Sequence, residues 1–154
     1  MDLTKSFPRS PKATIAGITM AARTADKGRA SVAGTLGEYH YDCSMDRMLF
    51  GFLGTDGVEF LGVVSSSSDD SGVTKLIEAK LASKSHKEID DYNHHLLGHA
   101  PEAGTDGAGY YTSIRGKVGH GRTDIFTWPD LIDVEEGRDV PHRSDTPDWA
   151  KPAH

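Results

Sequence analysis

Ser31–Phe52 reads SVAGTLGEYHYDCSMDRMLFGF, and the spacing of its apolar residues changes partway along. Ser31–Thr35 and Glu38–Asp42 are two short runs separated by Leu36-Gly37, and a two-residue connection that ends in glycine is typical of a tight hairpin turn. The apolar residues that follow recur at helical spacing, namely Met45, Met48, Leu49 and Phe52. The stretch therefore predicts a small β-hairpin, at about residues 31–42, that leads directly into a helix.

Helical spacing also dominates the rest of the chain. Ser10-Pro11 is typical of a helix start, because serine caps the first amides and proline fits the first turn. Asp56 with Glu59, and Ser85 with Glu88, have the spacing of helix-capping pairs. Apolar stripes three or four residues apart run through Ile15–Ala25, Phe60–Val64, Val73–Leu81, Ile89–Leu96, Tyr110–Val118 and Ile125–Val134. The sequence predicts a mainly α fold, a compact bundle of about six to seven short helices with one small hairpin.

A chain of 154 residues has the size of one domain and can bury a core without metals or disulfides. From Glu135 onward the sequence becomes charged and rich in proline. We predict a single helical domain over residues 1–138, followed by an extended C-terminal tail over residues 139–154. The hydrophobic content of 36% is modest, which leaves room for a homodimer that completes the core.

Charge and composition narrow the classes of partner. A formal net charge of -6 argues against a nucleic-acid partner, which usually requires a basic surface. No apolar run approaches the ~20 residues that cross a membrane, and Met1–Pro11 lacks the basic-then-apolar pattern of a signal peptide. The single cysteine, Cys43, excludes an intramolecular disulfide. Together these features predict a cytoplasmic protein with no membrane partner.

The second strand of the predicted hairpin carries a dense set of groups that can move protons. Glu38, His40 and Asp42 alternate along it and would share one face. A histidine titrates near neutral pH, and either carboxylate would orient its imidazole. Tyr39 and Tyr41 would lie on the other face, where they offer phenol donors or a stacking surface. The same alternation also fits an ordinary half-exposed strand whose tyrosines pack on a helix.

Charged residues late in the first predicted helix would lie near this strand, because the helix feeds directly into the hairpin. Arg23, Asp26 and Arg29 are spaced by three residues and follow one stripe. Asp26 would help to orient His40, and either arginine could hold an anionic group of a substrate. The alternative is a solvated face of ion pairs, each worth little. Trp128 is a further aromatic candidate for ligand contact.

Two other patterns offer metal or nucleophile chemistry. Asp91, His95 and His99 are spaced by four residues, which would place them on one helix face as ligands for a divalent metal. No glutamate follows His95 as in zinc proteases, and the three residues also fit a solvated helix surface. Cys43 would lie in a strand-to-helix turn, where it is either a nucleophile or a small buried hydrophobe.

Nucleotide-binding motifs are missing from the sequence, which contains no dinucleotide fingerprint, P-loop or nucleophile elbow. We therefore expect no organic cofactor. The residues predict an enzyme that acts on a small molecule by acid–base chemistry, as a lyase, isomerase or hydrolase. His40 would be the general acid or base, oriented by Asp26, Glu38 or Asp42. The alternative is a non-catalytic module that binds a small ligand or a protein.

Several short motifs resemble those of a bacterial family known only as a domain of unknown function. They are Leu3-Thr4-Lys5, Pro8-Arg9-Ser10-Pro11, Asp26–Ala30, Ala33-Gly34, Gly37–Cys43 (GEYHYDC), Thr127-Trp128 and Asp130–Asp133. The resemblance covers roughly Asp2 to Gly137, and it implies a small, mainly helical protein without an assigned activity. Ser44-Met45-Asp46 departs from the proline-leucine-aspartate of that family, and the histidines at 94, 95 and 99 lie outside its pattern.

Overall fold

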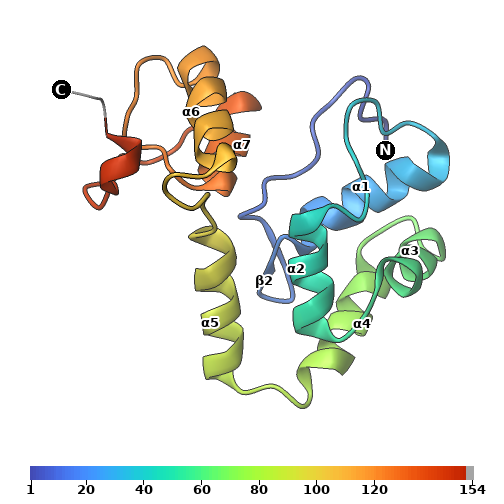
Figure 1. The fold of residues 1–154 in the computed structure, drawn as a ribbon. Helices are drawn as coiled ribbons and strands as arrows, with labels where there is room; N and C mark the ends of the chain where they lie inside the picture. The colour runs from blue at the N-terminus through green and yellow to red at the C-terminus, as the bar shows by residue number, and fades with distance from the viewer. Residues whose placement is uncertain (152–154) are drawn as a thin grey trace. The chain divides into compact units, whose positions relative to one another are not determined.

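The computed structural model of the chain describes residues 1–151. They contain seven α-helices, one two-stranded sheet and a short 3-10 helix, which confirms the predicted mainly α fold with one hairpin (Figure 1). The chain divides into two compact units, Met1–Leu96 and Leu97–His154. The first unit is built from β1 (Thr14–Ile15), β2 (Ile18–Thr19), α1 (Ala21–Ala33), α2 (Ser44–Leu53), α3 (Gly57–Ser65), α4 (Ser71–Leu81) and α5 (His86–Leu97).

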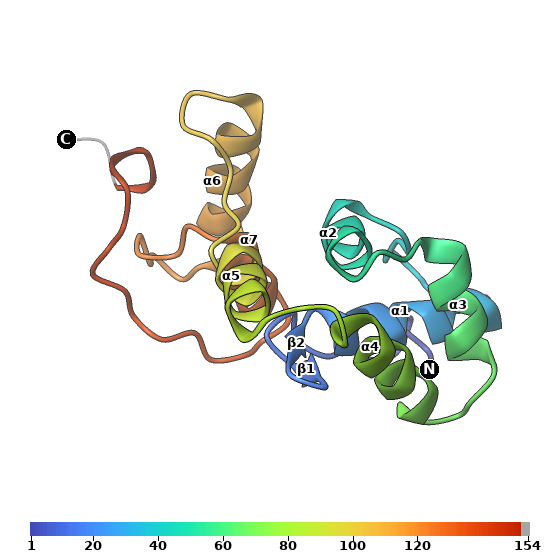
Figure 2. The same cartoon turned by 90° about the horizontal axis from the view of Figure 1, so that it is seen from below.

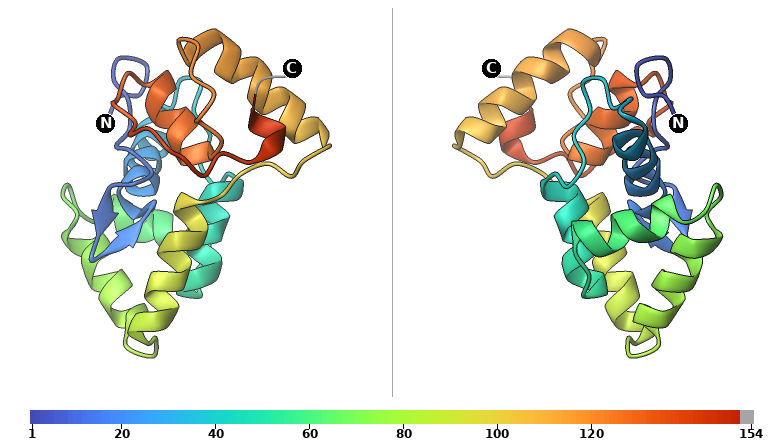
Figure 3. Two further views of the ribbon diagram at one scale, coloured as in Figure 1. Left: turned by 90° about the vertical axis from the view of Figure 1, so that its left-hand side faces the viewer. Right: turned by 90° about the vertical axis from the view of Figure 1, so that its right-hand side faces the viewer.

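The hairpin lies earlier in the chain than predicted, before α1. β1 pairs antiparallel with β2, with Ile15 opposite Ile18, and Figure 3 shows the two short strands as paired arrows. Ala16 and Gly17 form the turn with φ values of 52° and 78°, the positive values that a tight two-residue hairpin turn requires. Both isoleucines are buried. Ile15 and Ile18 are three residues apart, a spacing that fits one face of a helix and also fits two residues that face each other across a two-residue turn. The predicted helix start at Ser10-Pro11 was therefore wrong.

Residues 31–42 do not form the predicted hairpin. They contain the last turn of α1 and an irregular connection to α2. Gly34, with φ 71°, ends α1 in a left-handed cap whose N–H bonds back to the helix. Gly34 thus terminates a helix, and no residue of the connection that contains Gly37 pairs with a strand.

α1 is the central helix of the first unit, since nine of its thirteen residues are buried. It packs closely on α3 at Gly28, where a Cβ would meet Tyr41, Val64 and Leu61 at 3.5 to 3.6 Å (Figure 2). The fully buried apolar side chains of the first unit include Ile18, Leu49, Phe60, Val73, Ile77 and Leu96. Because α1 is enclosed, its polar side chains must find partners inside the protein.

A buried ion pair joins α2 to α1. Lys27 Nζ lies 2.8 Å from Asp46 Oδ2, and the two side chains are 5% and 0% exposed. The Thr24 hydroxyl donates to Asp46 Oδ1 at 2.7 Å, and the Cys43 backbone N–H, at the start of α2, donates to Oδ2 at 3.1 Å. Three donors therefore converge on one carboxylate, and they fix where α2 begins relative to α1.

α5 is held by the hairpin through side chains of its central turn. Asn93 Oδ1 accepts from the Thr19 backbone N–H at 3.0 Å and from the Thr19 hydroxyl at 2.8 Å. Asn93 Nδ2 donates to the Gly17 carbonyl at 2.9 Å, and the Tyr92 hydroxyl donates to the Thr19 carbonyl at 3.0 Å. The two short strands thus support a helix that follows them by more than sixty residues.

The second unit contains α6 (Asp106–Val118), α7 (Trp128–Glu135) and the 3-10 helix η1 (Asp148–Ala150). Its core is formed by Tyr111, Ile125, Leu131 and Val140, with Trp128 and Trp149 packed against them. Val140 and Ala150 are buried, so the described part of the predicted extended tail contributes to this unit. Residues 152–154 lie outside the described residues, and a domain boundary at residue 138 stays a prediction.

The helices are short, and the longest ones, α1 and α6, have 13 residues each. No single helix among residues 1–151 is long and apolar enough to cross a membrane. By length and composition alone, α2 and α3 would qualify as a pair, although an 88° bend separates them.

Removing one partner of the Lys27–Asp46 pair should destabilise the protein strongly, because the other partner is left as a buried charge without a counter-ion. Lys27→Met leaves a buried carboxylate without its cation, and Asp46→Leu leaves a buried ammonium; we expect each to lower the free energy of unfolding by about 3–5 kcal/mol. The double variant should lose at least ~1 kcal/mol less than the sum of the two. Urea unfolding of the four proteins measures this coupling.

The exposed pair Lys87–Asp91, at 2.6 Å, provides a matched control on α5. The same substitutions there should change the free energy of unfolding little and without coupling, because water already screens both charges. Additive effects of Lys27→Met and Asp46→Leu would show that the two buried groups do not depend on each other.

Candidate functional site

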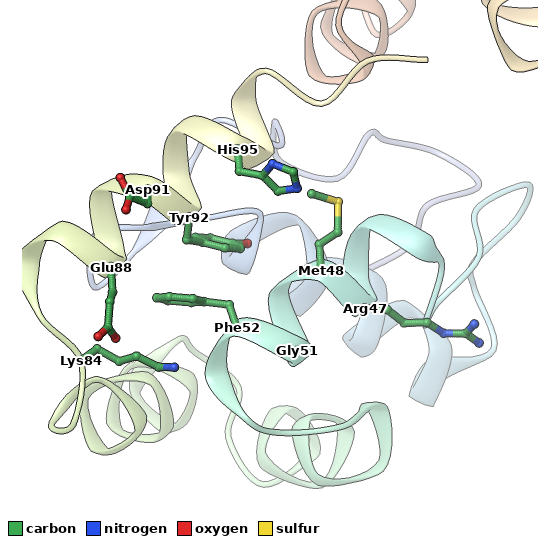
Figure 4. A pocket seen from close by; sticks show the side chains of 9 residues that line it. All are labelled: Arg47, Met48, Gly51, Phe52, Lys84, Glu88, Asp91, Tyr92 and His95. Carbon is green, nitrogen blue, oxygen red and sulfur yellow. The ribbon is translucent and has the colours of Figure 1, made fainter. Parts of the chain in front are cut away.

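An open groove lies between α2 and α5, within the first unit. Its volume is about 570 Å³, which falls in the roughly 300–1,000 Å³ range of small-molecule sites. α2 contributes Arg47, Met48, Gly51 and Phe52. The other side is formed by Lys84, Glu88, Asp91, Tyr92 and His95. Figure 4 shows that side chains from the two helices face each other, with Phe52 beside Tyr92 and Met48 beside His95.

Two stacked rings form the apolar part of the groove. The Phe52 and Tyr92 centroids are 4.4 Å apart, with an angle of 16° between the planes. Lys84 Nζ lies 4.9 Å from the Phe52 centroid, where its charge meets the face of the ring. Burial raises the pKa of the Tyr92 phenol. Tyr92 therefore stays protonated near neutral pH and contributes an apolar surface rather than a titrating group.

Gly51 leaves the α2 side of the groove open. A Cβ at this position would meet nothing within 4 Å. A glycine inside a helix is less favourable than alanine by about 1 kcal/mol, so helix stability does not account for it. The structural consequence is free volume beside Phe52, into which a longer side chain at position 51 would extend.

The charged groups around the groove balance one another. Arg47 and Lys84 are positive, and Glu88 and Asp91 are negative. Among residues 1–151, no hydrogen bond or ion pair engages the side chain of Glu88 or His95. The groove therefore offers an apolar surface, no net charge and two polar side chains that a ligand can engage.

The acid–base set predicted around His40 is not aligned in the structure. Glu38 and His40 are exposed and lie on the irregular connection between α1 and α2. Asp42 has a left-handed backbone, with φ 64°, and pairs with Arg47 at 3.2 Å. The predicted shared strand face is wrong because the strand does not form. A catalytic role for His40 stays a prediction.

The two tyrosines of the GEYHYDC stretch have separate environments. The Arg23 guanidinium carbon lies 5.5 Å from the Tyr39 ring centroid, so this stretch contacts the first turn of α1 through Tyr39. The Tyr41 hydroxyl donates to the Gly57 carbonyl at 2.7 Å, which ties the connection to the start of α3. Burial, and then the nearby Asp46 carboxylate, raises the pKa of Tyr41. Tyr41 is thus a packing residue that stays protonated at neutral pH.

Asp26 and Arg29 belong to an ion-pair network. Asp26 Oδ1 lies 3.0 Å from Arg9 and 3.6 Å from Arg29. Both arginines also reach Asp70, at 2.8 and 3.0 Å, and the hydrogen bond from Arg9 is the main cause that lowers the pKa of Asp70. The network joins the N-terminal segment, α1 and the start of α4. This geometry favours the ion-pair interpretation of the α1 charges.

The predicted metal triad is not assembled on one helix. Asp91 and His95 line the groove, but α5 ends at Leu97, before His99. Over the described range 1–151, no three His, Cys, Asp or Glu side chains are arranged to hold a metal ion. His99 therefore does not share a helix face with Asp91 and His95.

The two remaining candidates, Trp128 and Cys43, make packing or polar contacts inside the protein. Trp128 belongs to the second unit, where its ring meets Tyr111 edge-on with centroids 5.0 Å apart. Cys43 Sγ accepts from Lys27 Nζ at 3.2 Å, so the thiol adjoins the buried pair between α1 and α2. Neither residue lines the groove.

Asp91 and His95 were predicted as metal ligands, and the apolar residues that line the groove were predicted only as parts of helical stripes. Met48, Phe52 and Tyr92 fit the apolar stripes of their helices, and helical spacing cannot distinguish a packed face from the wall of a groove. Gly51 was the local signal, because it interrupts a stretch of otherwise good helix formers beside two large apolar residues.

A comparison with family models gives one informative match. The model described as "Domain of unknown function (DUF5069)" matches residues 5–138, a range that contains the hairpin, α1 to α7 and the whole groove. A search of curated proteins finds no match. The family match covers most of the chain and confirms the resemblance to a family without an assigned activity. The chain therefore belongs to the family described as a domain of unknown function (DUF5069).

Proposed function

We propose that the protein binds a small molecule with a flat apolar body and a neutral or zwitterionic charge in the groove between α2 and α5. The observation that carries the proposal is the pairing of an open, ring-lined volume of about 570 Å³ with polar side chains that lack partners in the described chain. Apolar grooves with a few convergent polar groups are the usual form of small-molecule sites.

The apolar body of the ligand would lie over Gly51, against Met48 and the edges of the Phe52 and Tyr92 rings. Burial of apolar surface contributes about 25 cal/mol per Å², so even a single aromatic ring gains from this contact. The volume left by the missing side chain of Gly51 is what admits a flat group.

Polar groups of the ligand would meet Glu88 and His95. These residues are seven positions apart on α5, which corresponds to about 10 Å along a helix. A molecule of about that length, with a donor or amine at one end and an acceptor at the other, would satisfy both side chains. The zero net charge of the lining supports a neutral or zwitterionic ligand over a strongly charged one.

An acid–base enzyme centred on His40 has less structural support. Glu38 and His40 are exposed, and no hydrogen bond or ion pair links His40 to another of residues 1–151. A general base is usually oriented by a partner that holds its ring. Binding without chemistry requires only the groove, so we prefer it to catalysis.

Filling the groove from position 51 should block binding. We expect Gly51→Leu to weaken the tightest-binding member of a panel of neutral and zwitterionic metabolites, including the aromatic amino acids, by at least about tenfold, because the new side chain would displace the flat body. Gly51→Ala should keep most of the affinity and raise the free energy of unfolding by about 0.5–1 kcal/mol. Saturation-transfer NMR identifies the binders, and calorimetry measures the affinities.

Gly62 provides the matched control, because it is an exposed glycine of α3 whose Cβ would also meet nothing within 4 Å. Gly62→Leu should leave the affinity unchanged. A panel without any binder, or equal binding to the wild-type protein and to Gly51→Leu, would contradict the proposed site.

Variants of Glu88 and His95 should change the affinity for a ligand according to the polar groups that the ligand carries. Glu88→Gln is expected to weaken a zwitterionic ligand by about tenfold, because a hydrogen bond to a charged group is lost, and to spare a neutral ligand of the same shape. His95→Gln should weaken both, since it changes the other end of the groove. Lys87→Gln, on the same helix but outside the lining, is the control. Equal losses for the two ligands in Glu88→Gln would argue against the proposed orientation.

A further inference from the structure

A second pocket lies within the second unit and is lined mainly by charged and titratable side chains. Its volume is about 430 Å³. The turn after α6 contributes His120, Arg122 and Asp124, and the segment before η1 contributes His142 and Arg143. Two arginines and two histidines are therefore gathered around one carboxylate in a chain whose formal net charge is -6.

Asp124 is the hub of this pocket, and its charge is already neutralised. Arg122 donates from Nε at 3.0 Å and from Nη2 at 2.9 Å, in the two-point geometry of an arginine–carboxylate pair. The Arg143 backbone N–H donates at 2.8 Å. These contacts, led by the hydrogen bonds from Arg122, hold the pKa of Asp124 far below its usual range. Asp124 is thus an ionised, saturated carboxylate that organises the groups around it.

Asp124 fixes the proton on one nitrogen of His142. His142 Nδ1 lies 3.1 Å from Asp124 Oδ2, and an ionised carboxylate requires this nitrogen to carry the hydrogen. The His142 side chain is 82% exposed, which leaves Nε2 accessible. A second proton on the ring would therefore lie on Nε2 and make it a cationic donor.

His120 lines the same pocket from a strained turn. Its φ is 50°, and Gly121 follows with φ 80°. A left-handed conformation is unfavourable for a residue with a side chain. Such strain is common where a side chain must be held at a binding site.

Arg143 presents an oriented guanidinium to the pocket. Its Nε donates to Asp130 at 3.0 Å, and its guanidinium carbon lies 5.1 Å from the Phe126 ring centroid. The side chain is 32% exposed, and Nη1 lies 3.6 Å from the exposed Asp145. The held Nε and the stacked ring fix the plane of the guanidinium, and the side chain stays partly exposed. Paired N–H groups of a guanidinium match the oxygen atoms of a phosphoryl group.

We propose that this pocket binds the phosphoryl group of a small molecule, held by Arg143 and by the protonated imidazoles of His120 and His142. A tetrahedral dianion has enough oxygen atoms to accept from all three side chains. The two arginines balance Asp124 and Asp130, and Asp145 adds one negative charge at the exposed edge. The favourable charge must therefore come from the histidines, so binding should be tighter at pH 6 than at pH 8.

The test titrates the full-length protein with sulfate and follows the ring C–H signals of the histidines by NMR. Sulfate is the first probe because, unlike phosphate, it stays a dianion at both pH 6 and pH 8. We expect saturable shifts of the His120 and His142 signals, and a dissociation constant at least about fivefold larger at pH 8 than at pH 6. His86 and His94, on α5 in the first unit, are internal controls whose signals should stay in place.

Further ligands separate the chemical classes. At pH 6, glycerol phosphate should shift the same two signals with an affinity at least equal to that of sulfate, because the ester keeps the phosphoryl oxygen atoms. Acetate should bind at least about fivefold more weakly, because it is planar and carries one charge. Binding of sulfate or inorganic phosphate without binding of glycerol phosphate would overturn the assignment to a phosphorylated molecule.

Two variants and one matched control localise the contact. Arg143→Gln and His142→Gln should each weaken sulfate binding at pH 6 by at least about fivefold. Arg138→Gln removes the same charge in the same unit, from an arginine that pairs with Asp133 and Glu136 outside the pocket, and should leave the affinity unchanged. Thermal unfolding identifies the variants that remain folded. Equal shifts of all histidine signals, or unchanged affinity in folded His142→Gln, would overturn the proposal.

Discussion

The ion pair between Lys27 and Asp46 is the constraint on which the first unit depends. α1 is enclosed by its neighbours, so the ammonium of Lys27 cannot reach water and must be satisfied where it lies. Asp46 meets this need from the first turn of α2 and also accepts from Thr24 and from the start of its own helix. A desolvated pair contributes less to stability than its attraction suggests, and here its main effect is geometric. It fixes the helix that carries Met48, Gly51 and Phe52.

The opposite side of the groove depends on a second set of polar contacts, between α5 and the β-hairpin. The amide of Asn93 bonds to the backbone of Thr19 and Gly17, so the β-hairpin holds α5 in position. The polar contacts inside the unit therefore position two helices, and the large apolar side chains between them are left with a partly open face. This arrangement explains how a small unit can have a well-packed interior and still keep a ring-lined groove of ligand size.

Local signals in the sequence were sufficient for the helical class and for several helix ends. Asp56 accepts from Glu59 N–H at 2.8 Å and Ser85 from Glu88 N–H at 3.1 Å, as the capping pairs predicted. The hairpin was misplaced because the spacing of Ile15 and Ile18 fits both a helix and a two-residue turn. The groove was not predicted, because the stack of Phe52 on Tyr92 joins residues forty positions apart and leaves no periodic pattern, and Gly51 alone does not identify a site. The pocket around Asp124 was also not predicted. Two of its residues, His142 and Arg143, lie in a segment whose composition indicates an extended tail.

The groove between α2 and α5 is the proposed ligand site of the protein. A crystal structure of the full-length protein with the tightest-binding molecule of the metabolite panel would locate that molecule. We expect electron density for a flat group over Gly51, beside the Phe52 and Tyr92 rings, with polar atoms within hydrogen-bond distance of Glu88 and His95. Density for the molecule elsewhere on the chain, with the groove holding only water, would show that the groove is not the ligand site.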